Sequence, residues 1–196
     1  MICAIVLAAG LSRRMGTQKL LLHFGGQTMI AHVVDRICAS VVDHVFVVVG
    51  PDGEEVARAV SDRPVTVVVN PQAASEMLDS VRCGLRALLE GCEAVLVALG
   101  DQPSITAELI DAMVAVYASG RIVVPTHAGR RGHPLLLSSQ YRHEILNSFG
   151  NTGLRGLLQA HPEAVFEFPV SDPMVLSDVD YPEDYRRALA EAEARR

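Results

Sequence analysis

Residues 4–19 read AIVLAAGLSRRMGTQK, a short apolar run followed by a loop that contains two glycines. The run from Ala4 to Leu7 is continuous in aliphatic residues, which is typical of a strand buried on both faces of a sheet. In the loop, Gly10 and Gly16 permit tight backbone turns. We therefore expect a buried strand that ends in a ligand-binding loop, an arrangement that α/β proteins use at the carboxyl ends of their strands.

Six further apolar runs follow, and each is short and nearly continuous. They are Val45 to Val49, Val65 to Val69, Ala94 to Leu99, Ile122 to Pro125, Leu135 to Leu137 and Val165 to Phe168. Between them, apolar residues recur at helical spacing in the sets Ile30, Val33, Val34, Ile37; Val81, Leu85, Leu88, Leu89; and Leu109, Ile110, Met113, Val114, Tyr117. Strands that alternate with helices predict an α/β, Rossmann-like three-layer sandwich with a mostly parallel sheet.

The pattern becomes less regular after Gly120. Around Gly129 to Pro134 we expect short antiparallel strands that cap an edge of the sheet. From Pro182 to Arg196 the chain is rich in Ala, Glu and Arg, with Pro182 placed where the first turn of a helix accepts proline. The C-terminal segment is therefore predicted to be a helix.

The composition is that of one globular domain. The 196 residues are 49% apolar, and we find no linker or repeat that would divide them, so residues 1–196 are expected to form a single domain. The net charge of −6 argues against a nucleic-acid partner, since such proteins need a basic surface. No apolar run has the length of a membrane span, and the start lacks the order of a signal peptide, so we expect a cytoplasmic protein. The four cysteines lack zinc-site spacing and are expected to be free thiols.

The first loop carries donors for an anion. Ser12, Arg14 and Lys19 suit phosphate oxygens, and the small residues around them let a ligand approach the backbone. The spacing of the two glycines fits neither the dinucleotide-binding GxGxxG pattern nor the Walker A loop. A plain strand-to-helix turn with solvated basic side chains remains an alternative interpretation.

Two carboxylates strengthen the phosphate interpretation. Asp101 directly follows the strand that ends at Leu99, and carboxyl ends of parallel strands meet at one edge of a sheet. A second acidic pair, Asp178 and Asp180, precedes the terminal helix. Magnesium arrives with a triphosphate and takes one or two protein carboxylates, which Asp101 and Asp180 can supply. Each of these residues also fits the simpler role of a turn or helix-cap residue.

Taken together, these residues resemble the molybdenum cofactor nucleotidyltransferase family, within the wider group of GT-A-like nucleotidyltransferases. The resemblance covers nearly the whole chain and rests on four ordered motifs. They are LAAG-x-S-x-RMG with a nearby lysine at Leu7 to Lys19, GD-x-P at Gly100 to Pro103, GHP at Gly132 to Pro134, and D-[IV]-D-x-P-[ED]-D at Asp178 to Asp184. The alanine at position 9 matches the cytidylyl-transferring branch, because the guanylyl branch usually has LAGG.

The resemblance implies a GT-A-like fold and transfer of CMP from magnesium-bound CTP to the phosphate of molybdenum-bearing molybdopterin. The nucleotide half would span about residues 1–105, and the acceptor half about 106–196. The implied nucleotide-binding residues are Leu7, Ala8, Ala9, Gly10, Ser12, Arg14, Lys19 and Ser80. Arg14, Lys19 and Asp101 would be catalytic, Asp101 and Asp180 would bind Mg²⁺, and His133 would meet the acceptor, with Arg130 and Arg131 beside it. A molybdoenzyme or a chaperone would be a transient partner.

Several alternatives stay open. Ser80 also fits a helix N-cap. The same chemistry could use GTP, or CTP with a sugar-alcohol phosphate as acceptor. A non-catalytic carrier of the molybdenum cofactor is a further possibility, although a pure carrier has no need for two metal-binding carboxylates. A nicotinamide-dependent oxidoreductase is disfavoured by the missing GxGxxG.

Overall fold

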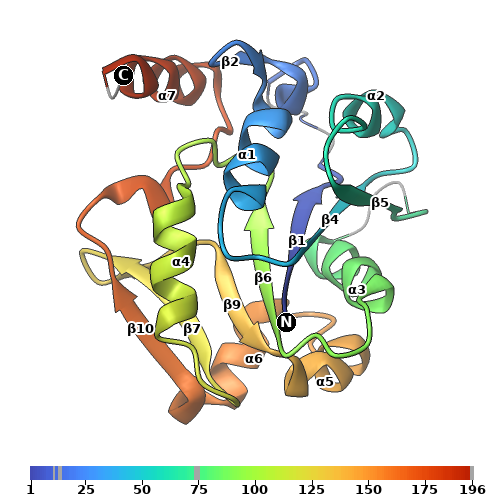
Figure 1. Cartoon of the computed structure of the whole chain (residues 1–196), viewed down its shortest axis with the longest axis vertical. Coiled ribbons are helices and arrows are strands. Elements are labelled where there is room, and N and C mark those ends of the chain that lie inside the picture. Colours follow the sequence, from blue (N-terminus) through green and yellow to red (C-terminus); the bar gives the residue numbers. More distant parts are fainter. Residues whose placement is uncertain (11, 13–14, 73–75, 195–196) are drawn as a thin grey trace.

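A mostly parallel mixed sheet forms the middle layer of the molecule (Figure 1). The computed structural model describes residues 1–10, 12, 15–72 and 76–194. Within these ranges, eight strands make one sheet, in which β8 (Arg130–Arg131) pairs only with β7. The other strands, in spatial order, are β5 (Val65–Val69), β4 (His44–Val49), β1 (Ile2–Ala8), β6 (Ala94–Leu99), β9 (Leu135–Ser138), β7 (Ile122–His127) and β10 (Val165–Pro169).

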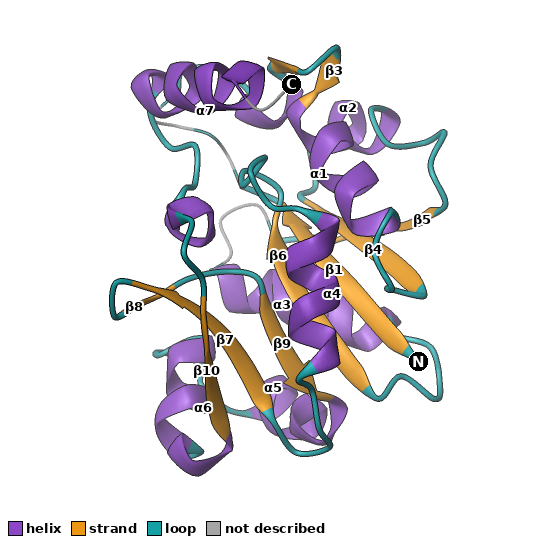
Figure 2. Cartoon of the chain, turned by 60° about the vertical axis from the view of Figure 1, so that its left-hand side comes forward, coloured by secondary structure: helices purple, strands orange, loops and turns teal. Residues whose placement is uncertain are grey.

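Helices cover both faces of this sheet (Figure 2). One face carries α1 (Met29–Cys38), α2 (Glu54–Arg58) and α4 (Ala107–Ala115), and the other carries α3 (Met77–Ala87), α5 (Arg142–Asn147) and α6 (Leu154–Ala160). Short 3₁₀ turns are η1 (Lys19–Leu21), η2 (Ser139–Tyr141), η3 (Pro162–Ala164) and η4 (Pro173–Leu176). The hairpin of β2 (His23–Phe24) and β3 (Gln27–Thr28) packs against the terminal helix α7 (Pro182–Ala194) through Phe24 and Ala188.

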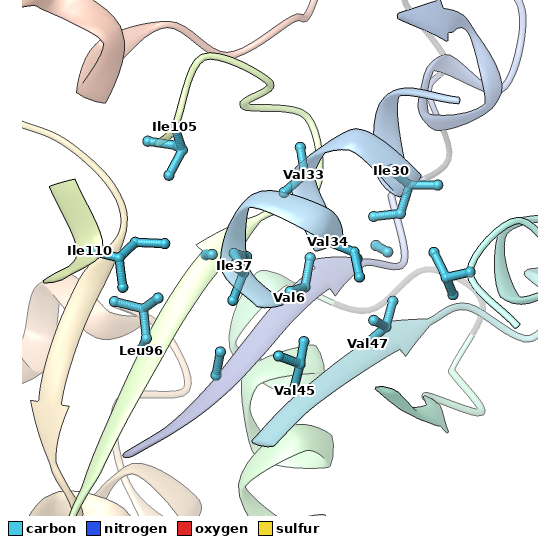
Figure 3. Packing of buried hydrophobic residues seen from close by; sticks show 14 of the residues in the cluster. Val6, Ile30, Val33, Val34, Ile37, Val45, Val47, Leu96, Ile105 and Ile110 are labelled. Carbon is cyan, nitrogen blue, oxygen red and sulfur yellow. The ribbon is translucent and has the colours of Figure 1, made fainter. Parts of the chain in front are cut away.

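The central strands β1, β4, β6 and β9 are apolar because both of their faces are buried, whereas β5 and β10 at the two edges are partly exposed. In β1, Ala4 and Val6 point to the α1 and α4 side, whereas Cys3 and Ile5 point to the α3 side. Figure 3 shows how the first side is filled: the apolar stripe of α1 lies across β1, β4 and β6. The contacting α1 residues are Ile30, Val33, Val34 and Ile37, and all are 2% exposed or less.

The predicted architecture is confirmed. Each of the seven predicted strands is present, with ends displaced by at most two residues, and so is the terminal helix as far as Ala194. Two helices are shorter than their apolar pattern: α3 ends at Ala87, before Leu88 and Leu89, and α4 ends before Tyr117. Leu88 and Tyr117 still contact the core from the turns that follow, since Leu88 is buried and Tyr117 packs at the edge of the core, whereas Leu89 is exposed.

The short antiparallel strand predicted around Gly129 to Pro134 is present as β8, which pairs with the end of β7. The prediction that antiparallel strands cap the edge was wrong, because the edge strand beyond β7 is β10, which runs parallel to β7. The next strand after β8, β9, is also antiparallel, but it lies inside the sheet between β6 and β7. β9 is buried along its whole length, and this is the pattern of an interior strand.

Among the described residues, no helix has both the length and the hydropathy that crossing a membrane requires.

Candidate functional site

One cation lies between two carboxylates at the carboxyl edge of the sheet. The Nζ atom of Lys19 is 2.5 Å from Oδ2 of Asp101 and 2.8 Å from Oδ1 of Asp180. The Lys19 side chain is only 11% exposed, and those of Asp101 and Asp180 are 19% and 34% exposed. These three residues, far apart in the sequence, therefore form one partly buried ionic cluster, which we call the Lys19 cluster.

The end of β6 brings Asp101 to this cluster. The backbone N–H of Gly100 donates to the carbonyl oxygen of Leu7 at 3.0 Å, so the turn after β6 is fixed to the end of β1. A Cβ at position 100 would lie 3.0 Å from that same oxygen and 3.0 Å from Cδ1 of Ile30. Glycine is needed here because the two strand ends approach so closely.

The first loop fixes the backbone of Lys19. Ser12 has a left-handed backbone, with φ of 48°, and its hydroxyl donates to Oε1 of Gln18 at 2.8 Å. The same hydroxyl accepts from the N–H of Lys19 at 3.1 Å. Ser12, predicted to contact nucleotide, therefore closes the loop and holds the start of η1. Arg14 was predicted to be catalytic and to bind nucleotide, and it lies outside the described residues.

The remaining predicted loop residues lie where β1 ends. Leu7 and Ala8 are the last residues of the strand, and Ala9 and Gly10 lead into the loop. Gly10 is exposed, and no described atom lies within 4 Å of a Cβ built on it. The backbone at Gly10 therefore borders open space in which a ligand could approach it.

Burial and charge act against each other in the Lys19 cluster. Burial alone would lower the pKa of Lys19, but Asp101 and Asp180 outweigh it and raise that pKa above its usual value. Burial raises the pKa of Asp101, Lys19 opposes that rise, and the nearby charge of Asp178 adds to it. Lys19 is thus held firmly as a cation, and its charge limits the rise in the pKa of Asp101 that burial causes.

A segment that we call the strap, residues 175–180, joins the Lys19 cluster to the GHP motif. At one end, Val175 accepts a hydrogen bond from the N–H of His133 at 2.9 Å. At the other, the N–H of Val179 donates to the carbonyl oxygen of Asp101 at 3.0 Å, and Asp180 follows. In Figure 2 this part of the chain rises from β10 through a short turn to α7. The strap thereby places Asp180 and His133 on one connected piece of backbone.

Close packing against the strap requires a glycine at position 132. A Cβ at this position would lie 2.1 Å from the carbonyl oxygen of Val175 and 2.7 Å from its carbonyl carbon. The strap therefore lies directly against the backbone of the GHP motif, and no side chain can fit between them.

Two buried polar atoms lie close to the strap without hydrogen bonds. Nδ1 of His133 and Oε1 of Gln102 have no hydrogen-bond partner among the described residues. Burial lowers the pKa of His133, and Asp178 opposes the shift only partly, so the ring is neutral near pH 7. Gln102 is 2% exposed and sits in the turn that carries Asp101. Orphaned polar atoms of this kind are uncommon, and they often mark a site where a ligand or water completes the bonding.

Ser80 is not a helix N-cap. The N-cap of α3 is Glu76, which forms a reciprocal capping box with Asp79, and Ser80 lies inside the first turn. Its buried hydroxyl accepts from Nδ2 of Asn70 at 3.1 Å. Asn70 is 1% exposed and follows β5 at the same sheet edge as Asp101.

The sequence interpretation missed Asn70 and Gln102, although both could have been found. Asn70 follows β5 as Asp101 follows β6, so the strand-end rule that selected Asp101 applies to it equally. The sequence held one more signal, since Lys19 is the only lysine in the chain. Arg130 and Arg131 are both exposed on the β7–β8 hairpin, and Arg131 pairs with Glu167 at 2.9 Å.

The Lys19 cluster has the donor set of a divalent metal site. Two carboxylate oxygens from separate segments already converge on one cation, the ammonium of Lys19. Among the described residues, no group of three His, Cys, Asp or Glu side chains could enclose a metal. Two carboxylates without a full protein cage match Mg²⁺, which keeps waters and takes substrate phosphates as further ligands.

The fold and this cluster define an α/β protein with one cation and two carboxylates at the carboxyl edge of its sheet, a set of groups that could hold a phosphate ligand together with a metal. The family model described as the MobA-like NTP transferase domain matches residues 4–165. This chain therefore belongs to the MobA-like NTP transferase family and is a nucleotidyltransferase by family.

Two curated relatives carry different names. The chain is 27% identical to the nicotine blue oxidoreductase of Paenarthrobacter nicotinovorans over 197 residues, which cover 96% of each chain. It is 26% identical to the molybdenum cofactor cytidylyltransferase of Escherichia coli over 182 residues, which cover 92% of each. The molybdenum cofactor family, which the sequence motifs resemble, is thus represented among the curated relatives.

Solved structures share the whole fold. A nucleotidyl transferase from Methanothermobacter superposes with a TM-score of 0.89 at 25% identity and covers 100% of this chain and 99% of its own. A Mycobacterium tuberculosis protein in complex with manganese gives a TM-score of 0.81 at 27% identity and covers 96% of this chain and 98% of its own. A divalent metal therefore occurs in a relative of the same fold.

Proposed function

We propose that this protein transfers CMP from magnesium-bound CTP to the phosphate of molybdenum-bearing molybdopterin, releasing pyrophosphate. The observation that carries the proposal is the Lys19 cluster, because it combines a cation for phosphate with two carboxylates for a metal. The E. coli relative named molybdenum cofactor cytidylyltransferase supports the choice of reaction. Ala9, which resembles the cytidylyl branch, supports the choice of CTP.

In this reaction an oxygen of the acceptor phosphate attacks the α-phosphorus of CTP in line. The bond between the α-phosphorus and the oxygen bridging to the β-phosphate breaks, and pyrophosphate leaves. The protein supplies positioning and charge rather than a nucleophile. Lys19, with Arg14 beside it in sequence, would bind the triphosphate, and the backbone of residues 7–10 would border it. A bound Mg²⁺, held by Asp101 and Asp180, supplies neutralisation of the phosphate charge.

The two halves of the chain would have different tasks. Residues 1–105 would bind nucleotide, and residues 106–196 would bind the acceptor, with His133 on the acceptor side. Ser80 would face the cytidine side through the buried pair that it forms with Asn70. A molybdoenzyme or its chaperone would receive the product as a transient partner.

The decisive experiment gives the purified protein molybdenum cofactor and Mg²⁺ with each nucleoside triphosphate in turn. Pyrophosphate release and the mass of the product are followed. We expect release with CTP and a product carrying cytidine. Pyrophosphate release with GTP and not with CTP would refute the cytidine assignment. If none of the triphosphates gives pyrophosphate release, the transferase proposal is refuted. Replacing the cofactor with a sugar-alcohol phosphate tests the other acceptor class.

A second candidate is favoured by one observation, the 27% identity to a protein named nicotine blue oxidoreductase. In that case a protein of the same fold would reduce a heterocyclic dye instead of transferring a nucleotide. Incubating the protein with NADH or NADPH and a heterocyclic dye, while recording the absorbance of the reduced cofactor, separates the two. Consumption of the reduced cofactor without pyrophosphate release would favour this second activity.

A further inference from the structure

We propose that Lys19 is an exchangeable counter-ion: it occupies the cation position between Asp101 and Asp180 until a triphosphate draws its ammonium away, so that metal and nucleotide bind only together. This inference rests on the proposed function, because it takes Asp101 and Asp180 as the metal-binding pair. It adds a positioning role to Lys19 beyond contact with phosphate.

The first argument is the geometry of the Lys19 cluster. The ammonium contacts one oxygen of Asp101 and one of Asp180, at 2.5 and 2.8 Å. A metal held by both residues would need these oxygens at similarly short distances. An ammonium and a divalent cation cannot share those positions, because two cations that close together repel strongly in a partly buried site. Metal binding by both residues therefore requires that the ammonium move.

The second argument is that Lys19 can move without disturbing the loop. Its backbone N–H is bound to the hydroxyl of Ser12, and η1 begins at this residue, so the main chain is fixed. The side chain beyond Cα has four rotatable bonds and ends in a compact charge that can turn toward a new partner. An arginine, with its planar fork, would be held more rigidly between two carboxylates.

The third argument is the residue choice in the whole chain. Lys19 is the only lysine in the sequence, whereas the other 16 of the 17 Lys and Arg residues are arginines. Arg63 illustrates the contrast, since two nitrogens of its planar guanidinium bridge Asp35 and Asp62 at 2.7 and 2.5 Å. The triphosphate brings several negative charges, which outweigh the two carboxylates as partners for the ammonium.

The single lysine allows a direct test by NMR. Protein labelled with ¹³C- and ¹⁵N-lysine gives one lysine side-chain signal, which reports Lys19 alone. We expect this signal to stay in place with Mg²⁺ alone and to move when α,β-methylene-CTP, which cannot release pyrophosphate, is added with Mg²⁺. Movement with Mg²⁺ alone would overturn the proposal. An unmoved signal, when calorimetry shows the nucleotide bound, would overturn it as well.

Metal affinity gives a second test that needs no turnover. Free Mn²⁺ is measured by EPR in wild-type, Lys19→Met and Arg63→Met proteins without nucleotide. We expect Lys19→Met to bind Mn²⁺ at least about tenfold more tightly than wild type, a ratio within the usual range of coupling between sites. Arg63→Met is the comparison variant, because it also uncovers two carboxylates, but those of Asp35 and Asp62 are more exposed, at 44% and 78%. It should gain less Mn²⁺ affinity than Lys19→Met, and an equal gain would overturn a role specific to Lys19. Equal or weaker Mn²⁺ binding by Lys19→Met would overturn the exchange.

The outcomes separate this inference from the proposed function. If calorimetry shows that no triphosphate binds, both fall together. If the lysine signal moves and the Mn²⁺ affinities differ as expected, but no CMP reaches the acceptor, the exchange stands and the transferase proposal falls. If Lys19→Met fails to fold, the wild-type lysine signal decides alone.

Discussion

Replacing Gly132 with alanine should damage both the fold and the site through one contact. The new Cβ would lie 2.1 Å from the carbonyl oxygen of Val175, and ordinary contact begins near 3.4 Å. The strap would have to retreat by roughly 1 Å, because the obstacle is backbone and cannot rotate away. That retreat breaks the 2.9 Å hydrogen bond from the N–H of His133 to Val175.

The expected cost has two parts. Overpacking costs about 1–3 kcal/mol, and the lost hydrogen bond adds about 0.5–1.5 kcal/mol, so the free energy of unfolding should fall by about 1.5–4.5 kcal/mol. For a chain of this size, that corresponds to a decrease in Tm of roughly 3–18 °C. Because the strap also carries Asp180, pyrophosphate release should decline by more than the fraction of unfolded protein explains.

The assay is urea and thermal unfolding followed by circular dichroism, with pyrophosphate release measured on the folded fraction. Gly150→Ala is the matched control, because its Cβ would meet nothing within 4 Å and its φ is not positive. We expect the control to stay within about 0.5 kcal/mol of wild type. If Gly132→Ala is as stable as Gly150→Ala, the close contact of the strap with the GHP motif is wrong.

Four further predictions follow from single contacts. Asp101→Asn should lower the rate of pyrophosphate release at least about 100-fold with the circular dichroism spectrum unchanged, and a near-normal rate would refute its role. Burial lowers the pKa of His133, so as the pH falls the unfolded chain binds a proton at this residue before the folded protein does. Below pH 6.5, the ordinary pKa of histidine, the wild type should therefore lose up to about 1.4 kcal/mol of stability per pH unit. His133→Gln should lack this pH-dependent loss in urea unfolding. Gln102→Met removes an orphaned buried oxygen, so the ligand-free protein should keep or gain stability by up to about 1 kcal/mol in urea unfolding, and a clear loss would contradict this. Ser80→Ala takes an acceptor from buried Asn70 and should cost about 1–2 kcal/mol, whereas no change in the urea midpoint would exclude a structural contribution of the pair.

The apolar runs predicted the strands well because they are short and lie between longer segments with helical spacing. The order of the strands beyond β6 was harder to predict. β9 has only the continuous apolar run Leu135 to Leu137, and such a run does not indicate whether a strand is parallel or antiparallel to its neighbours. Helix ends were missed at Leu88 and Tyr117, because apolar side chains can contact the core from a turn as well as from a helix. Local patterns thus specified the elements, and long-range pairing decided their arrangement.

The rule that parallel strands end at one edge of a sheet selects Asp101, whereas Asp180 lies in the strap and not at a strand end. The two carboxylates lie beside one ammonium, although their separation of 79 positions gives no local signal of this proximity. Their joint contact with Lys19 could not be read from the sequence, because it depends on how the strap crosses the end of β6. Ser12 shows the reverse case: its donor suits phosphate, yet the described loop uses it internally.

The reversed direction of β9 has an evolutionary consequence. Because β9 is antiparallel to β6, the segment before β9 lies at the same edge of the sheet as the segment after β6. Substitutions around Gly129 to Pro134 can therefore change the chain beside the strap and the Lys19 cluster, while the parallel strands β1, β4 and β6 keep their register.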